Sequence, residues 1–129
     1  MYQIMIVSVG IDIVEHSVTK KLGWDTNTLK VRRFFSKEEL IAQDMRNQIQ
    51  YLSGRFAAKE ATLKCLCTGM QDGISLKDVV VLSSPLGNPY IKLTGRAQIV
   101  AIERGINMWH ISISHSSQFS MAMVIAEAQ

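Results

Sequence analysis

Four charged residues interrupt an alanine-rich, otherwise largely apolar stretch of the sequence, LSGRFAAKEATLKCLCTG (52–69): Arg55, Lys59, Glu60 and Lys64. At about 100° of rotation per residue, Lys59 falls inside the apolar stripe of the predicted helix, and Glu60 falls at the border of that stripe. Lys64 lies one turn after Glu60, so the two side chains are neighbours on the helix surface. A buried charge without a partner is strongly unfavourable, so these residues must be paired, bind a ligand or change their pKa.

Each charge also has an ordinary structural explanation. Lys59 could pack its aliphatic stem against the core and extend its amine to water. Glu60 and Lys64 could form an exposed ion pair that contributes about 0.3–0.5 kcal/mol. The small residues of the segment argue against a helix that is simply exposed, because they allow another helix or a ligand to approach the backbone closely. These residues are Ala57, Ala58 and Ala61.

Two further residues could take part in chemistry. Asp12 follows a run of β-branched residues, and it is either a turn former that ends the strand or a metal ligand. Two carboxylates from separate elements, here Asp12 and Glu60, suit Mg²⁺, which proteins usually bind through one or two carboxylates together with substrate phosphates. His115 follows an alternating strand and lies among serines. By itself it indicates no more than a histidine in a turn.

The N-terminal half must position Asp12, Glu60 and Lys64. Residues 4–14 predict a buried first strand that leaves the sheet through a turn at Gly10 and Asp12. A capping box at residues 36–39 predicts a short helix that ends near residue 46. The long helix is expected over residues 49–67, with Gly69 as a left-handed cap.

The C-terminal half predicts a β-hairpin, a helix and two closing strands. The hairpin is expected from residues 78–82 and 89–93, and the helix over residues 95–104 with Thr94 as its N-cap. An alternating strand ends near His115, and a last strand begins at Phe119. The predicted order is β, α, α, β, β, α, β, β, which excludes an all-α or all-β fold.

The composition sets broad limits on the class of protein. The 129 residues, 47% of them apolar, predict a single domain over 1–129 with its own core. The net charge of +3 suits an anionic partner without selecting a nucleotide, an acidic protein or nucleic acid. Cys65 and Cys67 are two residues apart on a helix, so we expect free thiols in the core and a reducing compartment. The apolar N-terminus is shorter than the roughly 20 residues of a membrane span and lacks a basic leader, so a cytoplasmic location is expected.

Several segments taken together resemble a known family. Their order and spacing are similar to those of the holo-[acyl-carrier-protein] synthases, the small 4′-phosphopantetheinyl transferases. The resemblance covers nearly the whole chain and implies an α+β fold, the 4′-phosphopantetheinyl transferase fold, in which a mainly antiparallel sheet packs with a long central helix. The segments are GIDIVE (10–15), FFSKEEL (34–40), GRFAAKEATLKCLCTG (54–69), LGNPYIKLTGRA (86–97) and ISISHS (111–116).

The resemblance also implies a reaction. Such enzymes transfer the 4′-phosphopantetheine group of coenzyme A to a serine of apo-acyl carrier protein, release adenosine 3′,5′-bisphosphate and need Mg²⁺. The small members are homotrimers with active sites between subunits. The resemblance therefore implies coenzyme A and acyl carrier protein as partners, and neither nucleic acid nor a membrane.

The resemblance also assigns roles to individual residues, according to their positions in the matching segments. The resemblance implies that Asp12 and Glu60 bind Mg²⁺ and that Glu60 and Lys64 are catalytic. The proton of the attacking serine is accepted by Glu60, directly or through water, or by Asp12 through water; the sequence leaves both open. The residues expected to contact coenzyme A are Arg55, Lys59, Lys64, Gly69, Pro89 and His115.

A basic surface is expected to meet the acidic carrier protein by electrostatic steering. One departure from the family concerns this surface: members often carry an arginine just after GIDIVE, and Val18 stands near that position here. Lys20 or Lys21 is expected to substitute for it, or the enzyme prefers an unusual carrier. The basic residues available are Lys20, Lys21, Lys30, Arg32, Arg33 and Arg46.

A non-catalytic module that binds nucleotides or RNA is the competing class. Such a module needs aromatic side chains that stack on bases between its basic residues. Of the nine aromatic residues, none interleaves with Arg55, Lys59 and Lys64. Phe56 falls on the apolar stripe instead. The sequence therefore favours the enzyme.

Overall fold

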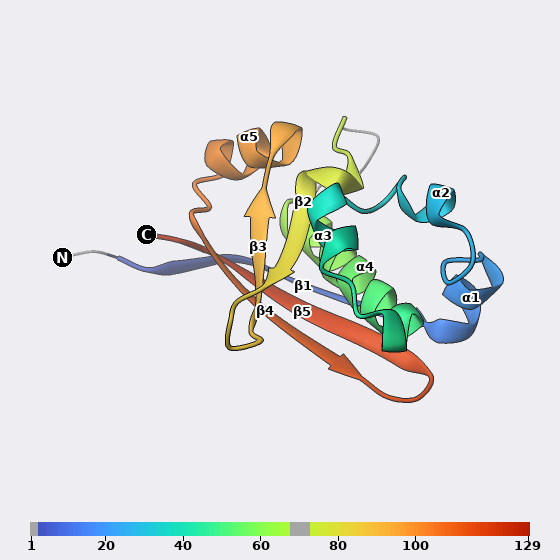
Figure 1. Ribbon diagram of the computed structural model, residues 1–129. Coiled ribbons are helices and arrows are strands. Elements are labelled where there is room, and N and C mark those ends of the chain that lie inside the picture. The colour runs from blue at the N-terminus through green and yellow to red at the C-terminus, as the bar shows by residue number, and fades with distance from the viewer. Residues whose placement is uncertain (1–2, 68–72) are drawn as a thin grey trace.

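The computed structural model describes residues 3–67 and 73–129. Two antiparallel sheets are present in this part of the chain (Figure 1). The larger has the strand order β1-β5-β4, from β1 (Met5–Glu15), β5 (Phe119–Ala128) and β4 (Met108–His115). The smaller is a hairpin of β2 (Val79–Ser83) and β3 (Pro89–Leu93). The α+β fold class expected from the sequence is confirmed.

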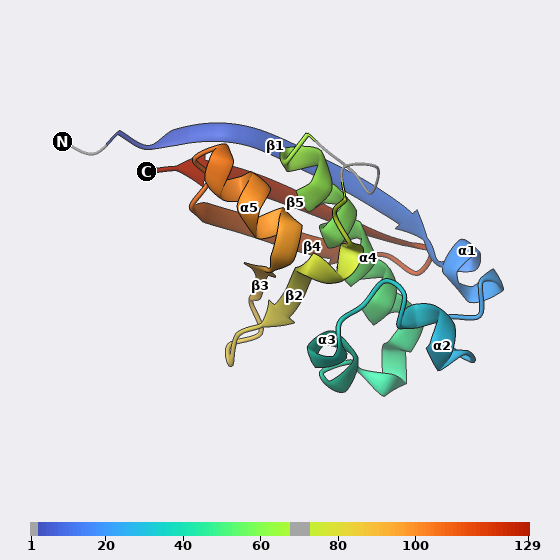
Figure 2. The ribbon, with the colours of Figure 1, turned by 90° about the horizontal axis from the view of Figure 1, so that it is seen from above.

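A long helix, α4 (Gln48–Cys65), lies between the two sheets, and shorter helices surround it. Viewed from above, α1 and α2 lie near one end of α4, while α5 lies near the end of the larger sheet at which the two termini lie (Figure 2). No helix in the described ranges is long and apolar enough to cross a membrane. The shorter helices are α1 (His16–Lys21), α2 (Thr28–Val31), α3 (Lys37–Ile41) and α5 (Gly95–Glu103), with 3₁₀ turns η1 (Met45–Asn47) and η3 (Leu76–Asp78).

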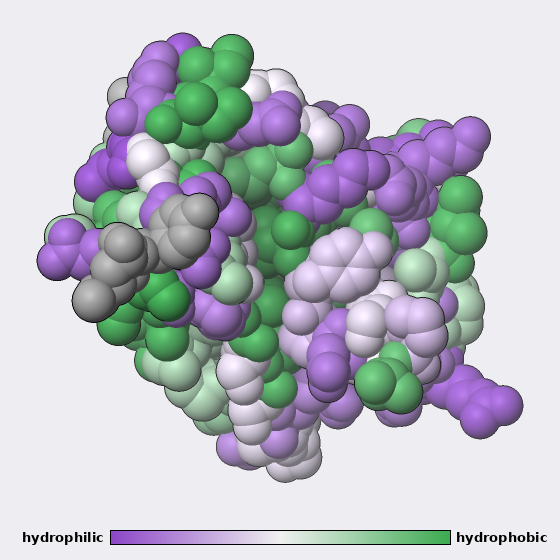
Figure 3. Space-filling view, turned by 90° about the vertical axis from the view of Figure 1, so that its left-hand side faces the viewer, coloured by the Kyte–Doolittle hydropathy of each residue, from purple (hydrophilic) through white to green (hydrophobic). Residues whose placement is uncertain are grey.

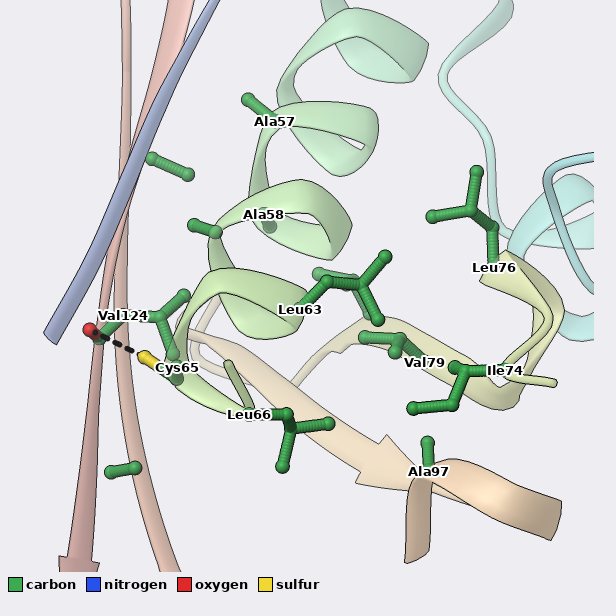
Figure 4. Close-up of a cluster of buried hydrophobic side chains, with 14 of the residues drawn as sticks. Ala57, Ala58, Leu63, Cys65, Leu66, Ile74, Leu76, Val79, Ala97 and Val124 are labelled. Atoms are coloured by element: carbon green, nitrogen blue, oxygen red, sulfur yellow. Dashed lines mark hydrogen bonds between the residues drawn. The ribbon is translucent and has the colours of Figure 1, made fainter. Parts of the chain in front are cut away.

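Two kinds of residue bury the two faces of α4. Its alanines lie against the larger sheet, and a β-carbon at Gly10 of β1 would come within 2.0 Å of the Ala61 carbonyl oxygen. The element that approaches the alanines is therefore a sheet, rather than another helix or a ligand. On the opposite face Leu63 packs toward Val79 and η3, while Cys65 donates its thiol hydrogen to the Val124 carbonyl oxygen of β5 (Figure 4).

Lys59 contributes to this packing through a buried ion pair. Its amine has no exposed surface and lies 2.6 Å from Oε1 of Glu39, which is also fully buried. The amine also donates to the Leu76 and Val79 carbonyl oxygens, at 2.9 and 2.5 Å. The Glu39 carboxylate accepts from the Val81 amide at 3.1 Å and from the Ser36 amide at 2.9 Å. One ion pair thus joins the start of α3, the middle of α4 and strand β2.

Four aromatic rings hold the α1–α2 region against α4. Trp24 lies 5.2 Å from Phe56 and 5.5 Å from Phe35 between ring centroids, and Phe34 lies 6.0 Å from Phe56. Edge-to-face pairs at such distances are favourable beyond their burial. Phe56 is therefore part of the core, as the apolar stripe predicts.

Several predicted elements are found, with differences at their ends. The capping box of Ser36 and Glu39 is present, but the helix that it starts ends at Ile41, because the chain turns into η1. Thr94 occupies the N-cap of α5, but its hydroxyl donates to the Asp78 carboxylate instead of accepting from the helix. Both cysteines are free, but only Cys65 is buried.

The prediction for the first strand is wrong in two respects. The strand does not turn at Gly10 and Asp12: it continues to Glu15, and Asp12 pairs with Ala122 of β5. The strand is also an edge strand with one exposed face, whereas its continuous apolar sequence predicts burial on both sides.

Candidate functional site

Asp12, Glu60 and Lys64 come together where β1 crosses α4. Side chains alternate along a strand, so Asp12 points to the same side as Gly10, the side that faces the helix. The close contact at Gly10 brings this part of β1 against the second half of α4. The Lys64 amine lies 3.1 Å from Oδ1 of Asp12 and donates to the Ile11 carbonyl oxygen at 2.7 Å. The lysine therefore pairs with the strand carboxylate, and not with Glu60 one turn earlier.

The second carboxylate of this group is in an unfavourable environment for a negative charge. Partial burial raises the pKa of Glu60, the nearby Asp12 carboxylate raises it further, and Lys64 lowers it. Two carboxylates close enough to repel each other leave a negative charge that a single lysine compensates only in part. A cation with room for both carboxylates would remove this repulsion.

The donor set fits a magnesium ion. Asp12 and Glu60 supply hard carboxylate oxygens from two separate elements, and Mg²⁺ typically takes one or two such ligands and completes its shell with water and substrate phosphates. Within residues 3–67 and 73–129 no group of three or more His, Cys, Asp or Glu residues forms a complete protein cage.

A second polar group lies around the first half of α4. The Arg55 guanidinium packs over the Tyr51 ring, 4.2 Å from its centroid, and Nη2 donates to the Ser83 hydroxyl at 2.6 Å. Ser83 pairs with Pro89 across the β2–β3 hairpin, so Pro89 lies near this arginine. The Nε–H of Arg55 is buried and makes no hydrogen bond in the described part of the chain.

His115 ends β4 beside the same stretch of helix. A β-carbon at Gly54 would come within 2.7 Å of Cε1 of the imidazole, so the absence of a side chain at Gly54 makes room for the ring. Nδ1 lies 2.8 Å from the Ser120 hydroxyl. Burial lowers the pKa of His115, and the nearby His16 and Arg55 lower it further. The neutral imidazole is therefore favoured.

The predicted site residues thus form two groups within one chain. One contains Asp12, Glu60 and Lys64, and the other contains Arg55 and His115, with Pro89 nearby. Arg55 and Glu60 are five residues apart, which corresponds to about 140° around the helix, so the two groups face different directions.

Two of the predicted coenzyme A contacts do not belong to either group. The structure does not bring Lys59 to an open surface, because its amine is buried and its three hydrogens are used by Glu39, Leu76 and Val79. Gly69 lies outside the described residues.

A polar cavity of about 530 Å³ lies beside α1 and the start of α4. Its lining includes His16, Lys20, Arg46 and Ser117. Sequence reasoning assigned no role to His16 or to Ser120. The sequence signal for His16 is its place in a polar segment directly after GIDIVE. The sequence signal for Ser120 is a polar residue within an otherwise apolar strand, and the structure shows that this residue is buried.

Comparison with known proteins identifies the family. Residues 8–124 match the family described as the 4′-phosphopantetheinyl transferase superfamily. The holo-[acyl-carrier-protein] synthase of Trichlorobacter lovleyi is 39% identical over 125 residues, which cover 96% of this chain and 99% of the relative. The Plasmodium yoelii acyl carrier protein synthase with ADP bound has a TM-score of 0.87 at 28% identity and 99% coverage of both chains. The Helicobacter pylori holo-[acyl-carrier-protein] synthase in complex with coenzyme A has a TM-score of 0.80 at 28% identity, over 92% of this chain and 99% of that one. The chain therefore belongs to the 4′-phosphopantetheinyl transferase superfamily, among the holo-[acyl-carrier-protein] synthases.

Proposed function

We propose that residues 1–129 form one catalytic domain that transfers 4′-phosphopantetheine from coenzyme A to a serine of apo-acyl carrier protein. The reaction requires Mg²⁺ and releases adenosine 3′,5′-bisphosphate. The observation that carries this proposal is the convergence of Asp12 and Glu60 beside Lys64, which offers two hard oxygen ligands and one ammonium to a pyrophosphate. The relatives named above, one with bound coenzyme A and one with bound ADP, support the substrate class.

The chemistry needs charge stabilisation and one proton acceptor. When bound, Mg²⁺ neutralises negative charge on the pyrophosphate oxygens, and Asp12 and Glu60 are the residues that would hold it. Lys64 is half-exposed, so its ammonium can leave Asp12 and contact the phosphate that becomes the leaving group. The serine hydroxyl attacks the phosphorus that bears pantetheine, and Glu60 is our proposed acceptor of its proton.

The nucleotide end of coenzyme A is assigned to the second group. Arg55 supplies a guanidinium that is held in place by the Tyr51 ring and Ser83. Pro89 and His115 border the same region, and Gly69 is retained from the family resemblance. Lys59 contributes to this site only indirectly, because its buried ion pair with Glu39 holds α4 against β2.

The separation of the two groups supports an active site between subunits. The outer face of the larger sheet is apolar and exposed along β1 and β5, including positions that alternate with Asp12. On the side that carries the termini, hydrophobic surface also lies uncovered beside hydrophilic surface (Figure 3). We propose that the sheet face is buried in a homotrimer, which would bring the Asp12 group of one subunit to the Arg55 group of the next. Its exposed apolar residues are Ile6, Val9, Ile11, Ile13, Phe119, Met121 and Met123.

The carrier protein is assigned to the exposed basic residues around α1 and α2. Lys20 and Lys21 occupy the last turn of α1, and Val18 is half-exposed on the same helix. We propose that these lysines take the place of the arginine that the family resemblance leads us to expect near Val18, and that they attract an acidic carrier through long-range electrostatics. The free cysteines fit a reducing cytoplasm.

Mass spectrometry of an apo-carrier protein tests the activity directly. Incubation with this enzyme, coenzyme A and Mg²⁺ is expected to add one phosphopantetheine to the carrier. Asp12→Asn and Glu60→Gln should abolish the addition while the circular dichroism spectrum stays native. Glu38→Gln is the matched control, because Glu38 forms only an exposed ion pair with Lys92. An unmodified carrier with the native enzyme would favour a nucleotide-binding module, and full activity of either site variant at low Mg²⁺ would refute the metal assignment.

A further inference from the structure

One line of side chains on α4 contains an aromatic ring, a guanidinium and an ammonium group. Tyr51, Arg55 and Lys59 follow one another at intervals of four residues, so they are neighbours along one side of the helix. Lys59 is fully buried and pairs with Glu39. Tyr51 and Arg55 are only partly buried. The line therefore runs from the core to the group of site residues that contains Arg55.

The Tyr51 ring is held by neighbours other than Arg55. Its hydroxyl donates to the Glu39 carbonyl oxygen of α3 at 3.2 Å. Burial raises the pKa of Tyr51, although the nearby Arg55 lowers it, so the hydroxyl keeps the hydrogen that it donates. The ring also packs against a cluster of buried apolar side chains, which consists of Trp24, Val31, Phe35 and Leu52. Tyr51 thus offers Arg55 a surface that does not move away.

The groups that hold Arg55 are uncharged. The guanidinium carbon lies 4.2 Å from the centroid of the Tyr51 ring, and Nη2 donates to the Ser83 hydroxyl at 2.6 Å. None of the ion pairs in the part of the chain that the structure describes includes Arg55. A carboxylate partner would also fix the guanidinium, but it would neutralise the positive charge. A ring and a hydroxyl fix the guanidinium and leave its charge for an anion.

We propose that Tyr51 is a positioning residue, whose ring keeps the charged Arg55 guanidinium in the place where it binds a phosphate of coenzyme A. This inference rests on the proposed function, which assigns the nucleotide end of coenzyme A to Arg55. Tyr51 acts on the ligand only through Arg55. Without the ring, the long arginine side chain must be ordered when the ligand binds, and that cost predicts a roughly two- to tenfold weaker affinity.

Isothermal titration calorimetry with coenzyme A and Mg²⁺, in the absence of a carrier protein, tests the role of the ring. Tyr51→Leu removes the ring and should weaken the binding of coenzyme A by roughly two- to tenfold. Tyr51→Phe keeps the ring and its packing, so its affinity should stay within about twofold of the wild-type value. Wild-type affinity in Tyr51→Leu would overturn the inference, and so would an equal loss in both variants.

A double-mutant cycle tests whether Tyr51 acts through Arg55. In an Arg55→Gln background there is no guanidinium to position, so Tyr51→Leu should cause no further loss of affinity for coenzyme A. A full additional loss would mean that the ring contacts the ligand directly or supports the fold. In the kinetics of Tyr51→Leu, the KM for coenzyme A should rise while kcat stays near the wild-type value. A lower kcat with an unchanged KM would overturn the positioning role.

NMR of protein labelled with ¹⁵N-arginine gives a test without any ligand. The Tyr51 ring should shift the guanidinium proton signals of Arg55 upfield in the wild type and in Tyr51→Phe, and Tyr51→Leu should abolish this shift. Unshifted signals in the wild type would overturn the inference. If the wild type binds coenzyme A but never modifies a carrier, the proposed transfer fails while the role of Tyr51 stands. If Arg55→Gln binds coenzyme A as tightly as the wild type, the inference fails even though transfer proceeds.

Discussion

The buried pair of Lys59 and Glu39 makes the sharpest prediction, because the sequence and the structure give Lys59 different roles. We expect Lys59→Met to destabilise the protein strongly. Methionine fills a similar volume but leaves the Glu39 carboxylate without its cation, and it leaves the Leu76 and Val79 carbonyl oxygens without a donor. Removal of one partner from a buried ion pair costs about 3–5 kcal/mol.

This cost converts into a shift that thermal unfolding can measure. An unfolding entropy of about 2.1 cal/mol/K per residue gives a total unfolding entropy of roughly 0.27 kcal/mol/K for the 129 residues. The expected fall in Tm is therefore about 11–18 °C. Far-ultraviolet circular dichroism, which reports the secondary structure, follows the unfolding transition. Lys92→Met is the matched control: its exposed pair with Glu38 should contribute about 0–1 kcal/mol.

Kinetics and a double-mutant cycle decide between the two roles of Lys59. Glu39→Gln combined with Lys59→Met should cost clearly less than the sum of the two single changes, because each single change leaves the other group buried without its partner. The KM for coenzyme A of folded Lys59→Met should stay near the wild-type value. An unchanged Tm together with a raised KM would refute the structural role and support direct contact between Lys59 and the nucleotide.

Three further predictions concern the site, the sheet and the carrier. Burial and Asp12 raise the pKa of Glu60 above its unfolded value, so ionisation of Glu60 opposes folding as the pH rises through that pKa. In chelator at neutral pH, Glu60→Gln should therefore be more stable to urea than the wild type, with the difference vanishing in acid below the unfolded pKa; a less stable variant at neutral pH would contradict this. Ile11→Glu should reduce the mass measured by light scattering to that of a monomer, whereas an unchanged mass would exclude this face from the interface. Added salt should raise the KM for the carrier by screening the basic surface, and a salt-independent KM would argue against steering.

Much of the fold could be predicted from local patterns. The hairpin strand at residues 89–93, the capping box at Ser36 and the long helix all follow from short-range rules, and the structure contains them. The exposed face of β1 could not be predicted in this way. A continuous apolar strand predicts burial on both faces, and the sequence of one chain does not state whether a second chain supplies one of them. The short helices α1 and α2 were missed because each is less than two turns long, so neither shows a helical period.

The site could be predicted in part. The convergence of Asp12 and Glu60 was expected from the family resemblance, and the two carboxylates lie close enough for Asp12 to raise the pKa of Glu60. The contact of Lys64 with Asp12 was not predicted, because the spacing along the helix places Lys64 beside Glu60. The burial of Lys59 was visible as a lysine inside the apolar stripe, but its partner Glu39 is 20 residues away and looks like an ordinary capping residue. The link between His16 and Ser120 joins positions 104 residues apart, so no spacing rule could find it.

The alternation of β1 sets a limit on how this strand can change. Its inward positions carry Gly10 and Asp12, and its outward positions carry Ile11 and Ile13. Insertion or deletion of one residue before Gly10 would exchange the inward and outward positions of the strand. The Asp12 carboxylate would then face away from α4, and the isoleucine side chains would face the helix backbone. We therefore expect the length of this segment to be far less tolerant of change than the identity of its outward residues, because this strand carries the proposed magnesium ligand on one face and the proposed subunit interface on the other.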